Sequence, residues 1–319
     1  MRDLLDAFEG WRAGGRRAAL ARLVDVSGQF PGRVGAALAV SEDGEVAGSL
    51  DHPGIEDAVV EAAGDLLAQA VGAPAASRIL MWDGRAVLLG RADWSVLAPL
   101  VDAVRGGRDV ALAVQTGGPG TGAALLVGGH GRLAGSLGHD RLDAVASADA
   151  LGALALGRTT THHYGPHGER HGREVAVFVE SFNRPPRLVV LGVSGLAGAV
   201  VRVASAAGFR VTVCDPGDLR SLGQLGPGDA VCVLSGDPRR ELVAVTAALA
   251  TGAGYVAALG GPTPHEARLD RLRGNGVAAE AVARLAAPVE WTDPAAAVVL
   301  CADIMARRRL GAPPPPSFR

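Results

Sequence analysis

Residues 187–215 read RLVVLGVSGLAGAVVRVASAAGFRVTVCD. A β-branched run (188–191) leads into a glycine turn, a helix of small residues follows (195–207), and a second apolar run (211–214) ends at an acid. A strand, a glycine turn, a helix and a second strand in this order form the start of a Rossmann βαβ unit. The stretch therefore predicts an α/β fold with a doubly wound parallel sheet for the C-terminal part of the chain.

The glycine turn also predicts a nucleotide site. Gly192 allows the tight turn, Gly195 and Ala197 let the helix lie close to the strand and to a ligand, and the helix N-terminus offers free N–H groups to a phosphate. Asp215 ends the second strand, where an acid can bind a ribose hydroxyl. However, Ser194 replaces the glycine that usually lets the backbone approach a pyrophosphate. Two interpretations stay open: a true dinucleotide site, and a Rossmann domain whose site is altered or vacant.

Later strands at 230–234 and 255–259 extend the same predicted sheet. Ligands of open parallel sheets bind beyond the carboxyl ends of the strands, so Ser235, Gly260 and His265 are expected to line one crevice with the glycine turn. His265 is the only histidine in this set, which makes it the candidate for acid–base or ligand contact. The alternative is a solvated residue in the first turn of the helix that begins there.

The N-terminal half carries an internal repeat. A strand at 36–40, a return strand at 45–49 and a helix at 54–71 are predicted from hydrophobic spacing. Residues 35–50 recur as 122–137 at a constant offset of 87 residues. Two copies of this hairpin-helix unit are therefore expected to pack together in one α+β domain.

Further elements surround the two copies. A helix over residues 2–24, running into a strand near its end, precedes the first copy, and a hairpin (78–89) and a helix (96–104) separate the copies. The predicted divisions are 1–156 for the N-terminal domain with its repeat, 157–186 for a strand and linker, 187–310 for the Rossmann-like domain and 311–319 for a disordered tail.

Histidines and cysteines give little sign of a metal site. Residues 157–173 hold four histidines, but interrupting glycines and a proline argue against a shared helix face, so a solvated loop is predicted: His162, His163, His167 and His171. The three cysteines fall in predicted strands or a helix and match no zinc spacing, which predicts packing roles: Cys214, Cys232 and Cys301.

Composition excludes several classes of function. The net charge of −2 gives no reason to expect nucleic acid or an anionic membrane as a partner. The chain contains no lysine, which excludes a Walker A lysine and Schiff-base chemistry. No apolar run of spanning length is present, and residues 1–9 are charged and amphipathic rather than a signal peptide, so a cytoplasmic protein is expected.

Motifs along residues 15–310 resemble the XdhC/CoxI family. The matching segments, taken together, are Gly44–Leu50 with Ile55-Glu56, Val177–Phe182 leading into Pro185–Leu188, Val211–Asp215, Tyr255–Gly260 and His265–Leu269. The family consists of accessory proteins for molybdenum hydroxylases such as xanthine dehydrogenase and carbon monoxide dehydrogenase. The resemblance implies an accessory protein rather than an enzyme, one that binds molybdenum cofactor, assists its sulfuration with a cysteine desulfurase, delivers it to the hydroxylase apoenzyme and forms a homodimer.

Departures from the family pattern predict a diverged member. The family's Ser-Gly-Gly-Cys turn reads Asp51–Gly54 here, so Gly54 stands in the cysteine position and His52 is the one candidate to replace it as a ligand. A thiolate is the natural soft ligand for molybdenum, and its loss weakens the case for cofactor handling. Two alternatives remain: an NAD(P)-binding oxidoreductase that uses Gly192, Gly195 and Asp215, and a scaffold that has lost its ligand.

Overall fold

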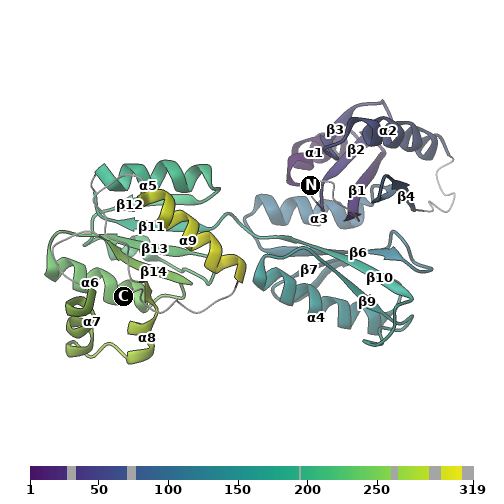
Figure 1. Cartoon of the computed structure of the whole chain (residues 1–319). Helices are drawn as coiled ribbons and strands as arrows, with labels where there is room; N and C mark the ends of the chain where they lie inside the picture. The colour runs from purple at the N-terminus through teal and green to yellow at the C-terminus, as the bar shows by residue number, and fades with distance from the viewer. Residues whose placement is uncertain (27–33, 70–76, 194, 260–264, 287–295, 311–319) are drawn as a thin grey trace. The chain divides into compact units, whose positions relative to one another are not determined.

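A computed structural model describes residues 1–26, 34–69, 77–193, 195–259, 265–286 and 296–310. The chain forms two compact units, Met1–Arg184 and Pro185–Arg319 (Figure 1). Among the described residues, every helix is too short or too polar to span a membrane. The site candidates Ser194 and Gly260, residues 287–295 and the predicted tail at 311–319 lie outside the described residues.

The N-terminal unit is built on two sheets. The first contains β1 (Ala18–Val26), β2 (Ala37–Ser41), β3 (Val46–Ser49), β4 (Arg78–Trp82) and β5 (Arg85–Arg91). The second contains β6 (Val110–Gly117), β7 (Ala124–Gly128), β8 (Gly131–Gly135), β9 (Thr160–Tyr164) and β10 (Val175–Phe182). Their strand orders are β3-β2-β1-β5-β4 and β8-β7-β6-β10-β9, and all neighbouring strands are antiparallel. The two sheets therefore have one topology.

Helices occupy the same places in both halves of this unit. The 3-10 helix η1 (Arg2–Leu4) and α1 (Leu5–Ala13) precede the first sheet, and α3 (Trp94–Arg105) precedes the second. Helices α2 (Pro53–Ala68) and α4 (Asp140–Leu156) each follow the third strand of their sheet. The predicted internal repeat is confirmed, but each copy is larger than predicted, because it also includes the leading helix and the last two strands.

Two glycines mark the same bend in each copy. Gly48 and Gly135 have φ values of +82° and +75°. A Cβ at Gly48 would lie 2.3 Å from the carbonyl oxygen of Ala37, and one at Gly135 would lie 2.1 Å from that of Ala124. Glycine is required at both positions because of the backbone angle and the close approach, and the duplication has kept it in both.

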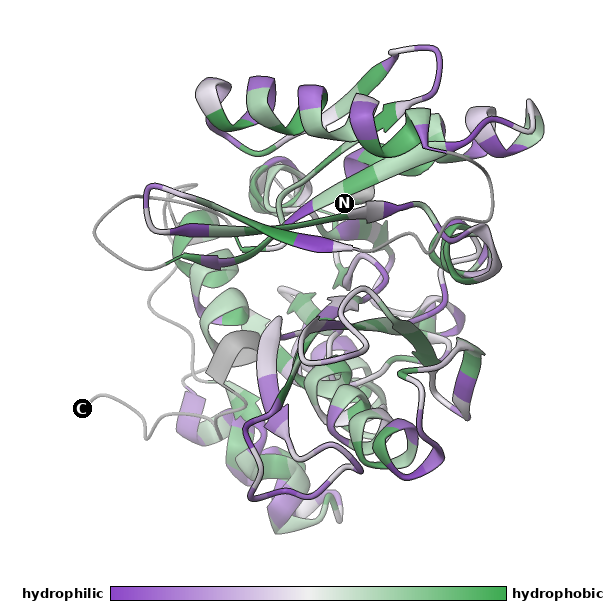
Figure 2. Ribbon diagram, turned by 90° about the vertical axis from the view of Figure 1, so that its right-hand side faces the viewer, coloured by the Kyte–Doolittle hydropathy of each residue, from purple (hydrophilic) through white to green (hydrophobic). Residues whose placement is uncertain are grey.

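The core of this unit has three parts. Helix α2 packs on β1, β2 and β5, and α4 packs on β6, β7, β8 and β10, so each sheet has a helix-covered outer face. The inner faces share a third cluster with α1 and α3, which contains Phe8, Trp11, Phe178 and Phe182. Figure 2 shows green through much of the sheets and along parts of the helices, and purple alternates with green along the helices. The two copies thus bury their common face against each other.

Two predictions for this half are wrong. The first helix ends at Ala13 rather than near residue 24, because Gly14 and Gly15 follow it, Gly15 with φ +67°, and the alanine-rich run after them forms the central strand β1. His162 and His163 lie in β9, paired with β10, rather than in a solvated loop. The interval 157–186, predicted as a strand and linker, therefore supplies two strands of the second sheet.

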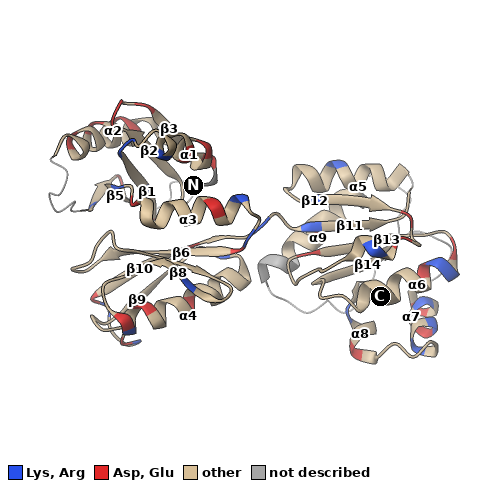
Figure 3. Ribbon diagram, turned by 180° about the vertical axis from the view of Figure 1, so that it is seen from behind, with Lys and Arg blue, Asp and Glu red and all other residues tan. Residues whose placement is uncertain are grey.

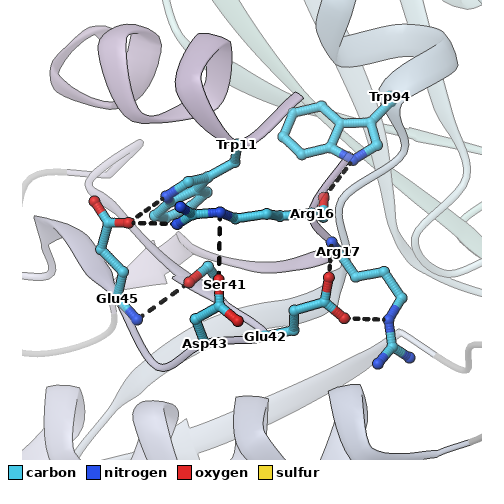
Figure 4. Close-up of polar contacts among 8 residues, drawn as sticks. All are labelled: Trp11, Arg16, Arg17, Ser41, Glu42, Asp43, Glu45 and Trp94. Atoms are coloured by element: carbon cyan, nitrogen blue, oxygen red, sulfur yellow. Dashed lines mark hydrogen bonds and ion pairs between the residues drawn. The ribbon is translucent and has the colours of Figure 1, made fainter. Parts of the chain in front are cut away.

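The turn between β2 and β3 is tied to the first helix and strand by side-chain contacts (Figure 4). The Glu45 carboxylate accepts hydrogen bonds from Trp11 Nε1 at 2.9 Å and Arg16 Nη1 at 3.0 Å. Arg17 Nε donates to Glu42 Oε2 at 2.7 Å. These bonds fix the hairpin before the chain enters the segment that leads to α2.

The C-terminal unit is a parallel sheet with helices on both faces. Its strands are β11 (Arg187–Leu191), β12 (Arg210–Cys214), β13 (Ala230–Leu234), β14 (Tyr255–Leu259) and β15 (Leu285–Ala286), in the order β12-β11-β13-β14-β15. One face carries α5 (Gly195–Ala206) and α9 (Ala296–Leu310). The other carries η2 (Leu219–Leu222), α6 (Pro238–Leu249), α7 (His265–Gly274) and α8 (Ala279–Ala283). The predicted doubly wound α/β fold is confirmed.

Candidate functional site

The strand order of the C-terminal unit fixes where a ligand can enter. The chain leaves β11 toward β12 on one side and later returns to β13 on the other side. In open parallel sheets this reversal opens a crevice at the carboxyl ends of the two central strands, and ligands bind there. The residues that follow β11 and β13 therefore form the candidate site.

Gly192 lets the ends of β11 and β13 lie close together at this crevice. Its φ is +142°, and a Cβ would lie 1.9 Å from the carbonyl oxygen of Leu234 at the end of β13. Its N–H donates to the carbonyl oxygen of Cys214 at 2.8 Å. A side chain at this position would push the strand ends apart, so the predicted turn glycine is required for packing as well as for any ligand.

The N-terminus of α5 is open to solvent. Gly195, the first residue of α5, is exposed, and a Cβ there would have no neighbour within 4 Å. Ala197 is only 3% exposed and packs in the core between α5 and the sheet. Gly195 therefore leaves first-turn N–H groups accessible to an anion, whereas Ala197 contributes close packing of the helix.

Asp215 presents its carboxylate at the end of β12. Its side chain is 61% exposed, Oδ1 accepts a hydrogen bond from Gly217 N at 2.8 Å, and Oδ2 lies 3.4 Å from Arg240 Nη1. The neighbouring Cys214 Sγ lies 2.8 Å from Ser221 Oγ. The Asp215 carboxylate is thus oriented by its own turn and remains accessible, as a ribose-binding acid must be.

Ser235 has a structural role in this arrangement. It is 8% exposed, and its Oγ lies 3.2 Å from both the N and the O of Asp237. The Asp237 carboxylate in turn caps α6 by accepting from Arg239 N at 2.8 Å. The hydroxyl predicted to line the crevice is therefore engaged with the backbone of its own turn.

His265 begins α7, as predicted, and is partly buried. Burial is the main cause that lowers the pKa of its imidazole, and the nearby Arg268 guanidinium lowers it further. Arg268 is fixed by Glu241, with Nε to Oε1 at 2.6 Å and Nη2 to Oε2 at 3.1 Å. The buried His265 Nδ1 has no hydrogen-bond partner among the described residues. His265 is thus a half-buried imidazole with a lowered pKa rather than a fully solvated first-turn residue.

His52 belongs to the N-terminal unit, immediately before α2. Its Nδ1 is buried and, within the described residues, lacks a hydrogen-bond partner. A Cβ at Gly54 would lie 3.6 Å from His52 Cε1 and 3.7 Å from Trp82 Cζ2, which is ordinary contact. A Cβ at position 54 would therefore fit beside the imidazole without any shift of the backbone.

An acid holds the turn before α2, and the second copy of the repeat has the same arrangement. Glu56 Oε1 accepts from Ser49 Oγ at 2.6 Å and from Leu50 N at 2.7 Å. The hydrogen bond from Ser49 lowers the pKa of the Glu56 carboxyl below its ordinary value. In the second copy, the Asp143 carboxylate accepts from Ser136 Oγ at 2.7 Å and Leu137 N at 2.6 Å. We call these two arrangements acid clamps; His52 and His139 lie within them at equivalent positions.

The described residues offer no cluster of side chains suited to bind a metal ion. Among the described residues, no three or more His, Cys, Asp or Glu side chains gather as a metal site would require. Cys232 and Cys301 are buried, and burial raises the pKa of both thiols, that of Cys301 to about 11. The burial of Cys232 and Cys301 gives both residues the packing role that the sequence predicts.

The charges on α7 are of both signs, as Figure 3 shows.

Sequence reasoning missed one feature of the N-terminal unit. The run Gly117-Gly118-Pro119-Gly120-Thr121-Gly122 begins at the last residue of β6, and its residues Gly120, Thr121 and Gly122 border a cavity between the two sheets. The density of glycines in this run is the signal that could have indicated a close backbone approach.

Comparisons with known proteins agree with the two-unit architecture. Residues 11–76 and 103–165 match the model for the XdhC and CoxI family, and residues 188–291 match the model for the XdhC Rossmann domain. Among solved structures, the fold is similar to that of a protein described as a xanthine dehydrogenase from Bacillus halodurans, with 15% sequence identity, a TM-score of 0.63 and coverage of 97% of this chain and 96% of that chain. At this identity the likeness shows the fold alone. No curated protein matches the chain.

Proposed function

Because the chain belongs to the XdhC and CoxI family, we propose that it is an accessory protein in the maturation of a molybdenum hydroxylase of the xanthine dehydrogenase or carbon monoxide dehydrogenase type. The observation that carries this proposal is the match of both family models, one in each unit of a single chain. The proposed partner is the hydroxylase apoenzyme. A cysteine desulfurase as sulfur donor and assembly as a homodimer are parts of the same proposal.

The N-terminal turn does not fit the soft metal centre of molybdenum cofactor. Gly54 stands where the family has a cysteine, and the free cysteines of the described chain all lie in the C-terminal unit. A nitrogen from His52 is a poorer match than a thiolate for a sulfur-rich molybdenum centre. We therefore assign no metal or sulfur transfer step to this turn.

The C-terminal unit fits the nucleotide part of such a cofactor. The exposed N-terminus of α5 at Gly195 can bind a diphosphate, and the exposed carboxylate of Asp215 can accept a ribose hydroxyl. His265 can contact the ligand from the first turn of α7 as a neutral group. These residues would hold either a pterin dinucleotide or NAD(P), so the crevice by itself leaves both ligands open.

Calorimetric titration with four ligands tests the proposal: molybdenum cofactor in its pterin form, its pterin-dinucleotide form, NAD and NADP. We expect the pterin dinucleotide to bind most tightly. Gly195→Asp should weaken this binding by about tenfold or more, because a carboxylate near the diphosphate costs about 1–4 kcal/mol at surface dielectric values. The variant should still fold, since its side chain enters open space and an acid is favourable at a helix N-terminus.

Matched variants identify the ribose contact. Asp215→Asn should weaken nucleotide binding, whereas Asp218→Asn, at an exposed acid in the same loop, should not. NAD(P) binding without pterin binding would favour the oxidoreductase alternative, for which the accessible Asp215 carboxylate is the supporting observation. If none of the four ligands binds, the scaffold alternative replaces cofactor handling, and apoenzyme pull-down then tests the accessory role alone.

A further inference from the structure

A cavity of about 60 Å³ lies between the two sheets of the N-terminal unit and continues outward into an open hollow of about 480 Å³. The two spaces share Ser77, Arg91, Ala92, Asp93 and Gly122 in their walls. Among the charged residues in the wall of the inner space, Arg22 is the one that is nearly fully buried, at 3% exposed. The rest of this wall consists mainly of apolar side chains: Leu20, Leu88, Val96, Leu97, Leu112, Val114 and Ala124.

The duplication explains why this space exists. Pairing registers identify equivalent residues: Gly90 pairs with Leu20 as Glu180 pairs with Leu112, and Arg22 pairs with Ala37 as Val114 pairs with Ala124. By the same register Ala92 is equivalent to Phe182. Three large buried side chains, those of Glu180, Phe182 and Arg22, fill one half of the shared core. Their equivalents in the other half are the smaller residues Gly90, Ala92 and Val114, which line the cavity.

Ser77 occupies part of the space that Gly90 leaves. A Cβ at Gly90 would lie 2.4 Å from Ser77 Oγ, and one at Gly122 would lie 2.0 Å from the same atom. In the other half the equivalent of Gly122 is Gly35, where a Cβ would lie 3.6 Å from Glu180 Oε1. The chain therefore partly refills the gap with a small hydroxyl and leaves the rest open.

Arg22 has hydrogen-bonding capacity that the described residues do not use. Its Nη2 lies 2.6 Å from Met1 Sδ, and its Nε lies 3.8 Å from Glu180 Oε2, which is too long for a hydrogen bond. Nε, Nη1 and Glu180 Oε2 are buried without hydrogen-bond partners in the described structure. Buried donors of this kind are destabilising unless an acceptor reaches them, and Arg22 is part of the cavity wall.

The charge balance selects the acceptor. Glu180 already supplies the negative charge opposite Arg22, so a second anion would leave an excess charge in a mostly apolar space. An uncharged carbonyl oxygen satisfies a guanidinium donor without that cost. At the rim, Arg91 donates to the carbonyl oxygens of Leu66 and Gln69, at 3.0 Å and 2.9 Å, so its guanidinium is engaged by the backbone at the end of α2.

Size limits the part of the ligand that enters. A cavity of about 150 Å³ holds benzene, so the inner space of about 60 Å³ takes a shorter group, and the rest of the ligand stays in the outer hollow. We propose that this cavity is a binding site for a small uncharged molecule with a terminal amide or carbonyl group, whose oxygen accepts a hydrogen bond from Arg22. This site is in the N-terminal unit and is independent of the nucleotide crevice.

Butyramide, butyrate and butylamine are probes of similar shape that differ in charge: the amide is neutral, the carboxylate is negative and the amine is positive. In saturation-transfer NMR titrations of the full chain, butyramide should bind at least about tenfold more tightly than either charged probe, because only the neutral amide avoids a net buried charge. Ala92→Phe restores the side chain of the equivalent position and should abolish butyramide binding, while Val46→Phe, at an exposed position of β3, should leave it unchanged. If Ala92→Phe fails to fold, Ala92→Leu serves as the smaller blocking substitution.

The role of Arg22 is tested without leaving a lone buried charge. Arg22→Met combined with Glu180→Gln removes both charges and should reduce butyramide affinity by about tenfold, which corresponds to the loss of about one strong hydrogen bond. Unchanged affinity in this double variant would overturn the assignment of Arg22. Failure of all three probes to bind, or tighter binding of butyrate than of butyramide, would overturn the site or its ligand class.

Discussion

The two acid clamps allow a matched comparison of one motif in two environments. The Asp143 side chain is 5% exposed and accepts hydrogen bonds from Leu137 N, Ser136 Oγ and Arg132 Nη1, at 2.6, 2.7 and 3.0 Å. Glu56 has the equivalent bonds to a serine hydroxyl and a backbone N–H, but it is more exposed and has no arginine partner among the residues described. Asp143→Ala should therefore destabilise the chain more than Glu56→Ala.

The size of the effect follows from what each substitution leaves behind. In Asp143→Ala the half-exposed Arg132 returns to water, but the N–H of the buried Leu137 loses its acceptor, which costs about 1–3 kcal/mol. Loss of the charge-assisted bond from Ser136 raises the total to about 3 kcal/mol. Glu56→Ala should cost about 1–2 kcal/mol, because water can replace the more exposed carboxylate.

Thermal unfolding followed by tryptophan fluorescence measures this difference. Three of the four tryptophans, Trp11, Trp82 and Trp94, lie in the N-terminal unit. For a unit of this size, about 3 kcal/mol corresponds to a fall in Tm of about 6–12 °C. Asp140→Ala, at the exposed first residue of α4, is the control and should cost less than about 1 kcal/mol. An equal or larger fall in Tm for Glu56→Ala would refute the reasoning.

Three further predictions concern the C-terminal unit. Gly192→Ala should destabilise it by about 3 kcal/mol or more, measured by urea unfolding, because the Cβ would overlap a carbonyl oxygen and strain the backbone; a loss below about 1 kcal/mol would contradict this. Glu241→Gln should cost about 3–5 kcal/mol since it leaves the buried Arg268 guanidinium unpaired, whereas Glu241→Gln with Arg268→Met should be close to neutral, and equal losses would disprove the argument. The pKa of His265 is lower in the folded state than the ordinary value of 6.5, so the unfolded state binds this proton more tightly. The free energy of unfolding is therefore unaffected by this proton well above pH 6.5 and decreases as the pH falls below 6.5. His265→Gln should remove that part of the pH dependence in denaturation titrations, and an unchanged profile would count against it.

Local sequence signals were sufficient for the C-terminal unit. The turn at Gly192, the acid at Asp215 and the capped helix after Asp237 each follow from short-range chemistry, and parallel strands that are buried on both faces read as continuous apolar runs. What the sequence could not show is the use of each side chain. Ser235 ends its strand as predicted, yet its hydroxyl is engaged by the backbone of Asp237, which depends on the conformation of the turn.

The N-terminal unit was harder to predict because apolar and polar residues do not alternate regularly along its strands. In β1, alanines stand on both faces between two packed layers, so the sequence of this strand does not interrupt the helical spacing of the preceding residues. Strand β9 was missed because polar residues occupy both of its faces: Thr161 and His163 are exposed, and Thr160 and His162 are half-buried on the face of Tyr164. The Arg22–Glu180 contact joins residues from different copies of the repeat, and no spacing rule connects them.

The duplication separates residues that the fold needs from residues that chemistry needs. A residue that holds the turn before an outer helix is required in both copies, and the serine and acid of the clamp are present in both: Ser49 with Glu56, and Ser136 with Asp143. The resemblance places Gly54 at the family's cysteine position in one copy, and the space beside His52 admits a Cβ there. A thiol at this position would therefore add a reactive group without being needed to support the fold. The scaffold of the family can be retained in full while the chemistry at this turn changes, which is why ligand binding, rather than stability, distinguishes a diverged accessory protein from a scaffold that has lost its ligand.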